Sequence, residues 1–319
     1  MTEIIAEFCQ NHKGSIELLK EMVWAAKENG ASYAKIQTIF AEDLTYRSEF
    51  EEGKSENGVQ KIIKRPFADE KNRLKPLELS EEAHGIFLET CQKAKIRPLT
   101  TVFSRARIPF VKSLGLDTIK IASIDCASYS FIRELSHHFG SLIISTGGTY
   151  DEEIRKTAEI LKGKNFTFLH CVTRYPTPLD KLNFRRMNFL RQFTPRVGFS
   201  DHSSPQKNGL KASLAAMAAG AILIERHFTL LKPEETKDGP VSINPSQLAA
   251  LSAAGRLSAK ELDKKIREEI PKAEYESMLG TENPGLSDEE LLNRNYYRGR
   301  FASHVGGKVI YNWEEEKVA

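Results

Sequence analysis

The sequence predicts an α/β protein, a (β/α)8 TIM barrel with a short C-terminal extension. Eight short apolar runs alternate with helix-like segments over roughly 250 residues, which matches the repeat number and length of such a barrel. No G-x-G-x-x-G follows the first run, which disfavours an open dinucleotide-binding sheet. We therefore place the barrel in residues 1–260 and the extension in residues 261–319.

The first strand–helix–strand unit sets the pattern for the rest of the chain. A buried strand begins at Ile4, a helix starts at Ser15 with apolar residues at helical spacing, and Gly30 supplies a stop before the strand 33–39. Residues 40–79 then interrupt the alternation with a polar, charged stretch that has no clear period. An insertion of this length in a compact domain is usually a functional lid or a mobile loop.

After the insertion the alternation resumes and completes the barrel. The predicted helices are 80–94, 105–114, 128–138, 151–161, 180–193 and 245–259, and the predicted strands are 97–103, 118–122, 142–145, 166–171, 197–199 and 221–225, with an alanine-rich helix before the last strand. From residue 260 the chain is strongly charged, and residues 296–313 indicate a hairpin that turns at Gly306-Gly307.

Composition excludes several classes of protein. A net charge of +3 over 319 residues gives no reason to expect binding to nucleic acid or to an anionic membrane. No apolar run approaches the roughly 20 residues needed to span a bilayer, and the first residues do not resemble a secretory signal. Cys9, Cys91, Cys126 and Cys171 lack C-x-x-C spacing, so we expect reduced thiols in a cytoplasmic protein.

Every predicted strand carries polar residues at its C-terminal end, where barrels of this kind place their active sites. They are Glu7, Lys35, Gln37, Thr101, Ser104, Lys120, Ser123, Asp125, Ser145, Thr146, His170, Thr173, Tyr175, Ser200, Asp201, His202, Glu225 and His227. Of these, His170 is most simply a buried core histidine.

Two lysines stand inside otherwise apolar strands. Lys35 and Lys120 would be costly to bury without an anionic partner. Together with the neighbouring hydroxyls, and with the backbone of Gly147-Gly148, they would suit a phosphate or carboxylate ligand. The alternative is that they pair internally with Glu7 or Asp125.

Two histidines end the last two strands, each beside a carboxylate. His202 follows Asp201, and His227 lies two residues after Glu225. Because neighbouring parallel strands end on the same side of a sheet, the two imidazoles could face one another and bind a divalent metal. On spacing alone, they could equally be two unrelated loop histidines.

Eight short segments together resemble a known family. In order, AEFCQNHKGS, AKIQT, TTVFSRA, KIAS, STGG, YPTP, GFSDHS and IERHFT are similar to motifs of the sialic acid (N-acetylneuraminate) synthases, which condense phosphoenolpyruvate with an N-acylated amino sugar. They span roughly residues 4–245. Any one segment is weak, but eight in order at the inferred strand ends are specific.

The resemblance implies a role for each of these positions. It implies a divalent metal on His202 and His227, usually manganese, with magnesium or cobalt as alternatives. It implies a phosphoenolpyruvate pocket of Lys35, Thr101, Lys120, Ser123, Ser145 and Ser200, with Thr173 near the phosphate. The sugar-side and acid–base positions match Glu7, Gln37, Asp125 and Tyr175. A homodimer is also expected, because the family is usually dimeric.

Some positions depart from the family pattern and leave alternatives open. Asp125 stands where a glutamate is common, Thr173 where an asparagine is common, and Val241 where a sugar-binding aspartate is expected. The residues after 260 are expected to be a remnant of, or a substitute for, the family's C-terminal antifreeze-like domain, whose arginine enters the partner's active site. A synthase acting on a different aldose, and a truncated, non-catalytic binding subunit, therefore stay as alternatives.

Overall fold

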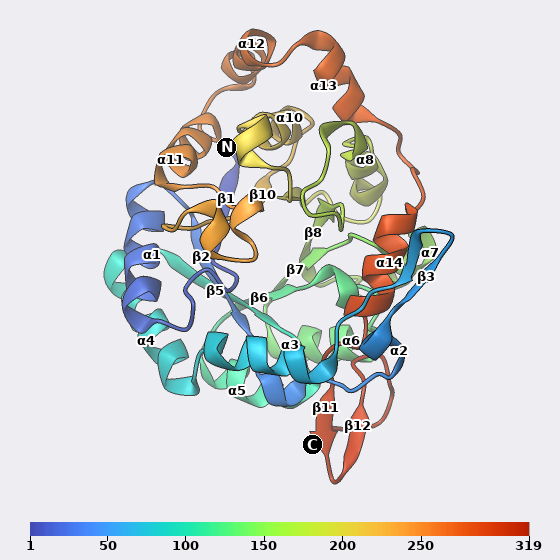
Figure 1. Cartoon of the computed structure of the whole chain (residues 1–319). Helices are drawn as coiled ribbons and strands as arrows, with labels where there is room; N and C mark the ends of the chain where they lie inside the picture. Colours follow the sequence, from blue (N-terminus) through green and yellow to red (C-terminus); the bar gives the residue numbers. More distant parts are fainter. Residues whose placement is uncertain (319) are drawn as a thin grey trace.

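Eight parallel strands close into a barrel in the computed structural model, which describes residues 1–318 (Figure 1). The strands are β1 (Glu3–Glu7), β2 (Tyr33–Thr38), β5 (Arg97–Val102), β6 (Thr118–Ile121), β7 (Ser141–Ser145), β8 (Asn165–Cys171), β9 (Val197–Asp201) and β10 (Leu223–His227). Successive barrel strands are neighbours, and β10 pairs with β1 to close the ring. The predicted eight-stranded barrel is confirmed.

Helices surround the strands on the outside of the barrel (Figure 1). They are α1 (Ile16–Glu28), α4 (Glu81–Ala94), α5 (Ile108–Ser113), α6 (Tyr129–His138), α7 (Asp151–Ile160), α8 (Arg186–Arg191), α10 (Lys211–Ala218) and α11 (Pro245–Ala254). The side chain of Ser15 caps α1 and that of Ser80 caps α4, and both serines are where the sequence predicted these helices to start.

Three predicted helices are shorter than expected. The helix predicted for 105–114 begins with a 3-10 turn (Arg105–Arg107), and α5 covers only the rest. The segment 180–193 is not one helix: a 3-10 turn (Leu179–Lys181) precedes α8, and Asn183 between them has a φ of +51°. A residue with positive φ cannot continue a right-handed helix, which is why α8 starts late. The helix predicted for 245–259 ends at Ala254, before Gly255.

Alternation along the strands separates two apolar clusters. Ile5, Leu99, Ile143, Leu169 and Leu223 form the cluster inside the barrel, while the outward-facing strand residues pack against the helices in a much larger core. Gly198 lies against the inner cluster, where an added Cβ would be 2.3 Å from the Leu223 carbonyl oxygen. This inner cluster, called the apolar plug below, fills the lower part of the barrel. The interior positions nearer the C-terminal strand ends are therefore left for polar groups.

The insertion after β2 is folded rather than structureless. It contains a 3-10 turn (Ala41–Asp43), α2 (Glu49–Glu52), a hairpin of β3 (Lys54–Glu56) and β4 (Val59–Ile62), α3 (Phe67–Leu74) and a second 3-10 turn (Lys75–Leu77). Arg47 donates hydrogen bonds to the carbonyl oxygens of Asn295 and Arg298 in the C-terminal segment. The insertion is therefore tied to residues that follow the barrel.

The C-terminal residues form three helices and a hairpin. They are α12 (Ala259–Glu269), α13 (Lys272–Leu279), α14 (Asp288–Tyr297), β11 (Ser303–Val305) and β12 (Lys308–Ile310), and the hairpin turns at Gly306-Gly307 as predicted. In Figure 1, α14 lies beside α7 and the β3–β4 hairpin. Among residues 1–318, no helix has the length and apolar character that crossing a membrane requires.

Candidate active site

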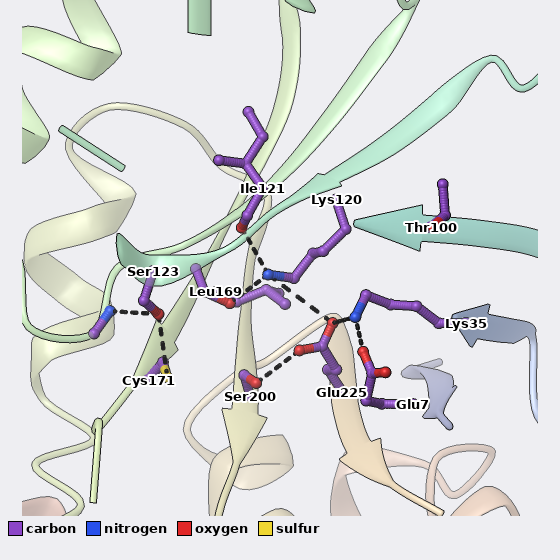
Figure 2. Close-up of polar contacts among 12 residues, drawn as sticks. Glu7, Lys35, Thr100, Lys120, Ile121, Ser123, Leu169, Cys171, Ser200 and Glu225 are labelled. Carbon is purple, nitrogen blue, oxygen red and sulfur yellow. Dashed lines mark hydrogen bonds and ion pairs between the residues drawn. The ribbon is translucent and has the colours of Figure 1, made fainter. Parts of the chain in front are cut away.

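Four buried charged side chains meet inside the barrel, beyond the apolar plug (Figure 2). Lys35 on β2 forms an ion pair with Glu7 on β1, and its Nζ lies 3.8 Å from Glu225 Oε2 on β10. Lys120 Nζ on β6 lies 4.0 Å from the same oxygen. Glu225 is thus shared by the two lysines, and Asp125 pairs with neither.

Burial and mutual attraction set the protonation of this network. Burial lowers the pKa of Lys35 to about 8 and also lowers the pKa of Lys120, although Glu225 opposes both shifts. Burial alone would raise the pKa of Glu225, but Lys120 and Lys35 hold it below its ordinary value. The two ammonium groups and two carboxylates balance in charge.

Hydroxyl groups surround the network on the same strand ends. Lys120 Nζ donates to Ser145 Oγ at 2.6 Å. It also donates to the Ile121 carbonyl oxygen at 2.8 Å, and Ser200 Oγ donates to Glu225 Oε1 at 2.9 Å (Figure 2). Thr101 is buried on β5, where it pairs in register with Lys120 and with the half-buried Gln37. Cations and hydroxyls in this arrangement can bind a phosphate or a carboxylate.

The loop after β7 approaches this region closely. Gly147 N–H donates to Ser123 Oγ at 3.2 Å. A Cβ at Gly147 would lie 2.8 Å from Thr173 Cγ2 and 2.9 Å from Cys171 Sγ. Only glycine lets the backbone approach β8 this closely, so the Gly147-Gly148 backbone stands beside Ser123 and Thr173.

The two predicted metal histidines face one another at the ends of β9 and β10. Their ring centroids are 5.4 Å apart. His202 Nδ1 lies 3.0 Å from the Val172 carbonyl oxygen, so this nitrogen donates and Nε2 keeps its lone pair. Burial lowers the pKa of His202 to about 4 and lowers that of His227, so both rings are neutral near pH 7, the form that binds metals.

Two further metal-ligating groups reach His227. Cys9 Sγ, a ring nitrogen of His227 and a carboxylate oxygen of Asp238 all lie within 4.8 Å of one another. Cys9 follows β1, and Asp238 lies in the loop after β10, just before a 3-10 turn (Gly239–Val241). This donor set fits a divalent metal.

A buried ion pair fixes the strand ends that carry the histidines. Arg226 Nη1 lies 2.5 Å from Asp201 Oδ1, both side chains are 1% exposed, and their residues are register partners on β10 and β9. Ser213 Oγ on α10 donates to Asp201 Oδ2. Because Asp201 and Arg226 immediately precede His202 and His227, this pair fixes the backbone from which both imidazoles project.

The remaining predicted site residues lie around the rim of the barrel. Asp125 is buried in a 3-10 turn (Ser123–Asp125) after β6, where it accepts hydrogen bonds from Ser128 Oγ and Asn312 Nδ2. Its other oxygen has no hydrogen-bond partner within residues 1–318. Thr173 is buried, while Tyr175 is 48% exposed with its ring 4.2 Å from that of His202.

Comparison with known proteins decides the family. The NeuB family model matches residues 22–267, most of the chain. The chain belongs to the NeuB family.

Curated NeuB relatives carry related names. The chain is 32% identical over 307 residues to a pseudaminic acid synthase of Campylobacter jejuni, which covers 94% of this chain and 81% of that protein. It is 32% identical over 303 residues to an N,N'-diacetyllegionaminic acid synthase of Legionella pneumophila, covering 92% and 78%. A solved N-acetylneuraminic acid synthetase of Leptospira borgpetersenii aligns with a TM-score of 0.68 at 26% identity, over 92% and 90% of the two chains.

These matches also fix the class of reaction. This NeuB protein is a nonulosonic acid synthase, a phosphoenolpyruvate-dependent enzyme that forms a carbon–carbon bond. Membership in the family confirms the resemblance drawn from the eight sequence motifs. It does not assign the acceptor sugar, since pseudaminic, legionaminic and N-acetylneuraminate-9-phosphate synthases all match.

Several residues at the site were given no role in it from the sequence. Glu225 was noted at a strand end, and period-two alternation would have placed it inside the barrel with His227. Cys9 and Asp238 are 229 residues apart and meet only through the closure of β1 against β10. Asn293 and Asn312, which bond to Thr173 and Asp125, come from the C-terminal segment and carry no sequence signal of their role.

Proposed function

We propose that the protein condenses phosphoenolpyruvate with an N-acetylmannosamine-like amino sugar, giving a sialic-type nonulosonic acid and phosphate. The observation that carries this proposal is the placement of two buried lysines beside two neutral, facing histidines in one barrel mouth. The lysines suit an anionic substrate and the histidines suit a metal.

The phosphoenolpyruvate half of the site is proposed to lie over Lys35 and Lys120. The two ammonium groups would neutralise the carboxylate and the phosphate, and Ser123, Ser145, Ser200 and Thr101 would donate to their oxygens. The tight approach of Gly147 to Thr173 would bring backbone N–H groups to the phosphate. The Glu225 carboxylate opposes the fall that burial causes in the pKa of both lysines, and so favours their charged forms before substrate binds.

The metal half is proposed to use His202 and His227, with manganese as the ion that the family resemblance implies. A divalent ion here supplies Lewis acidity toward the sugar aldehyde. Gln37 and Tyr175 would position the sugar. In the reaction, C3 of phosphoenolpyruvate attacks the aldehyde carbon, water adds at C2, and phosphate leaves.

Two carboxyl groups are proposed to move protons during these steps. Glu7 is ion-paired to Lys35 inside the barrel, and burial raises the pKa of Asp125 to about 6. A carboxyl group with a pKa near neutral can both accept and return a proton at physiological pH.

Residues 261–318 are proposed to close the barrel mouth. Asn293 Nδ2 donates to the Thr173 carbonyl oxygen at 2.8 Å, Arg294 Nη1 binds Glu153, and Asn312 binds Asp125.

The protein is also proposed to be a homodimer and to be located in the cytoplasm. Light scattering coupled to gel filtration tests the homodimer, since a monomer at micromolar concentration would contradict it.

The experiment that tests the function is an acceptor panel. Purified protein is incubated with phosphoenolpyruvate, manganese and a set of 2-acetamido sugars, and phosphate release and product mass are measured. We expect phosphate release with at least one N-acylated sugar, and a product heavier than that sugar by one pyruvate unit. No release with any sugar on the panel would contradict the proposal.

A second candidate keeps the chemistry and changes the acceptor. Val241 stands where the family pattern puts a sugar-binding aspartate, and the 32% identical relatives are named pseudaminic and legionaminic acid synthases. A sugar with two acetamido groups, as the name of the diacetyllegionaminic acid synthase suggests, therefore belongs on the panel beside N-acetylmannosamine. Product mass separates the two outcomes.

A further inference from the structure

Cys9 adopts a backbone conformation that is unfavourable for its residue type. Its φ is +48°, in the left-handed region that glycine occupies readily and that is strained for other residues. The residue is buried, and its N–H donates to Glu7 Oε1 at 2.6 Å. Glycine would satisfy the same backbone geometry with less strain, so the side chain itself needs an explanation.

The thiol of Cys9 lies where side chains from several loops converge. Cys9 Sγ is 2.9 Å from Asp238 Oδ2, and both groups lie within 4.8 Å of a His227 ring nitrogen. The opposite histidine, His202, turns its Nδ1 toward a backbone carbonyl and so leaves Nε2 free. A weak S–H···O hydrogen bond accounts for the pair Cys9 and Asp238, but not for the His227 imidazole beside it.

We propose that Cys9 is a thiolate ligand of the catalytic metal, together with His227 and Asp238. On binding, the thiol proton passes to solvent and the sulfur lone pair forms the metal bond. Thiolate is a soft ligand, so this mixed sulfur, nitrogen and oxygen set favours Zn²⁺, Co²⁺ or Fe²⁺ over Mn²⁺ and Mg²⁺. The inference rests on the proposed function only in placing the ion at that same site.

Cobalt spectroscopy tests the proposal without any turnover. Co²⁺ is titrated into the reduced protein, and the near-ultraviolet thiolate-to-cobalt charge-transfer band is recorded. We expect a band in the unaltered protein that saturates at one equivalent and is absent from Cys9→Gly and Cys9→Ser. Cys9→Gly also relieves the positive-φ strain, so its unfolding midpoint should not fall, and a lost band cannot be ascribed to misfolding.

Two other buried cysteines serve as controls. Cys91 lies on α4, away from the site, and Cys171 Sγ is 3.7 Å from His202 Nδ1, the nitrogen that hydrogen-bonds to the Val172 carbonyl oxygen. Cys91→Ser and Cys171→Ser should both keep the band. The proposal is overturned if the unaltered protein binds Co²⁺ without the band, if the band survives Cys9→Gly, or if it disappears in Cys171→Ser.

Metal competition supplies a second readout. Cys9→Gly should lower Zn²⁺ affinity by roughly 10- to 100-fold while changing Mn²⁺ affinity far less, because removal of a soft ligand chiefly affects thiophilic ions. Equal losses for Zn²⁺ and Mn²⁺ would contradict a thiolate bond. These binding results stand whether or not the acceptor panel yields product, so failure of the synthase proposal and failure of this one are distinguishable.

Discussion

Asn312 in the C-terminal segment donates a hydrogen bond from Nδ2 to Asp125 Oδ1 at 3.0 Å, inside the barrel mouth. The same amide donates to the Phe103 carbonyl oxygen at 2.9 Å, so it joins the loops after β5 and β6. Burial raises the pKa of Asp125 to about 6, while the hydrogen bonds from Asn312 and Ser128 act in the opposite direction. A residue outside the barrel therefore helps to set the ionisation of a predicted proton-transfer group.

Removal of that donor should shift the pH profile of the enzyme. In Asn312→Ala, the ionised form of Asp125 loses a buried hydrogen bond, so its pKa should rise by about one unit. If Asp125 must be ionised to accept a proton, the acid limb of the kcat–pH profile moves to higher pH by the same amount. Asn188→Ala, at an exposed asparagine, is the control. A lower kcat with an unmoved acid limb would show that Asn312 does not tune Asp125.

Asp125 should also reduce stability at neutral pH. Its pKa is raised from 3.8 to about 6, so the folded state holds this proton more tightly than the unfolded state does. The resulting stability is present below about pH 4 and is lost as pH rises to about 6, a change of about 3 kcal/mol at 1.36 kcal/mol per pKa unit.

Asp125→Asn removes this penalty at the expense of activity. We expect urea unfolding to show a variant more stable than the unaltered protein at pH 7 by up to about 3 kcal/mol, with the difference shrinking toward pH 4. Turnover should fall sharply in the same variant if Asp125 transfers a proton. A variant less stable than the unaltered protein at pH 7 would mean that the Asp125 carboxylate stabilises the folded state.

Binding of phosphoenolpyruvate should depend on the protonation of Lys35. Burial lowers the pKa of Lys35 to about 8, so above that pH the free enzyme must take up a proton to present the cation to an anion. Affinity should be flat from pH 6.5 to 7.5 and fall by up to about tenfold per unit above pH 8.

Calorimetry can detect this proton directly. Titrations at pH 8.5 in buffers of different ionisation enthalpy should report proton uptake, and titrations at pH 7 should report little. Lys93→Met, at an exposed lysine paired with Glu89, should leave both results unchanged. Affinity that stays constant from pH 7 to pH 9 would exclude Lys35 as the titrating group.

The barrel and most of its interior polar groups could be predicted from the sequence, for identifiable physical reasons. Period-two alternation and the short apolar runs were enough to place Glu7, Lys35 and Lys120 inside the mouth. Charge pairing was harder to predict, because the partner shared by both lysines is Glu225, and only the closure of β10 onto β1 brings it to Lys35.

Contacts between distant segments were beyond sequence reasoning. The meeting of Cys9 with Asp238 and of Asp125 with Asn312 depends on loop conformation and on how the C-terminal segment folds back. The positive φ of Cys9 is a backbone property that no residue pattern indicates. The fold of the insertion was likewise hidden, because its short elements are too brief to show a period.

The buried pair Asp201 and Arg226 should hold both the fold and the metal site. Asp201→Asn leaves a guanidinium that is 1% exposed without its charge partner, which should cost about 3–5 kcal/mol of unfolding free energy. Because the pair precedes His202 and His227, loosening it should also weaken metal affinity by roughly tenfold or more. Urea unfolding and metal titration measure the two effects.

Two further variants distinguish the effect of the buried charges of Asp201 and Arg226 from that of their hydrogen bonds. Asp263→Asn breaks an exposed pair with Arg267 on α12 and should cost less than about 0.5 kcal/mol. The double variant Asp201→Leu with Arg226→Met removes both buried charges and should recover much of the stability lost in Asp201→Asn, because no unpaired charge stays buried. Metal affinity should not recover with it, since the hydrogen bonds from Ser213 to Asp201 and from Arg226 to Ser203 are also lost. If the double variant recovered both stability and metal affinity, packing alone, rather than the polar contacts of Asp201 and Arg226, would align the two histidines.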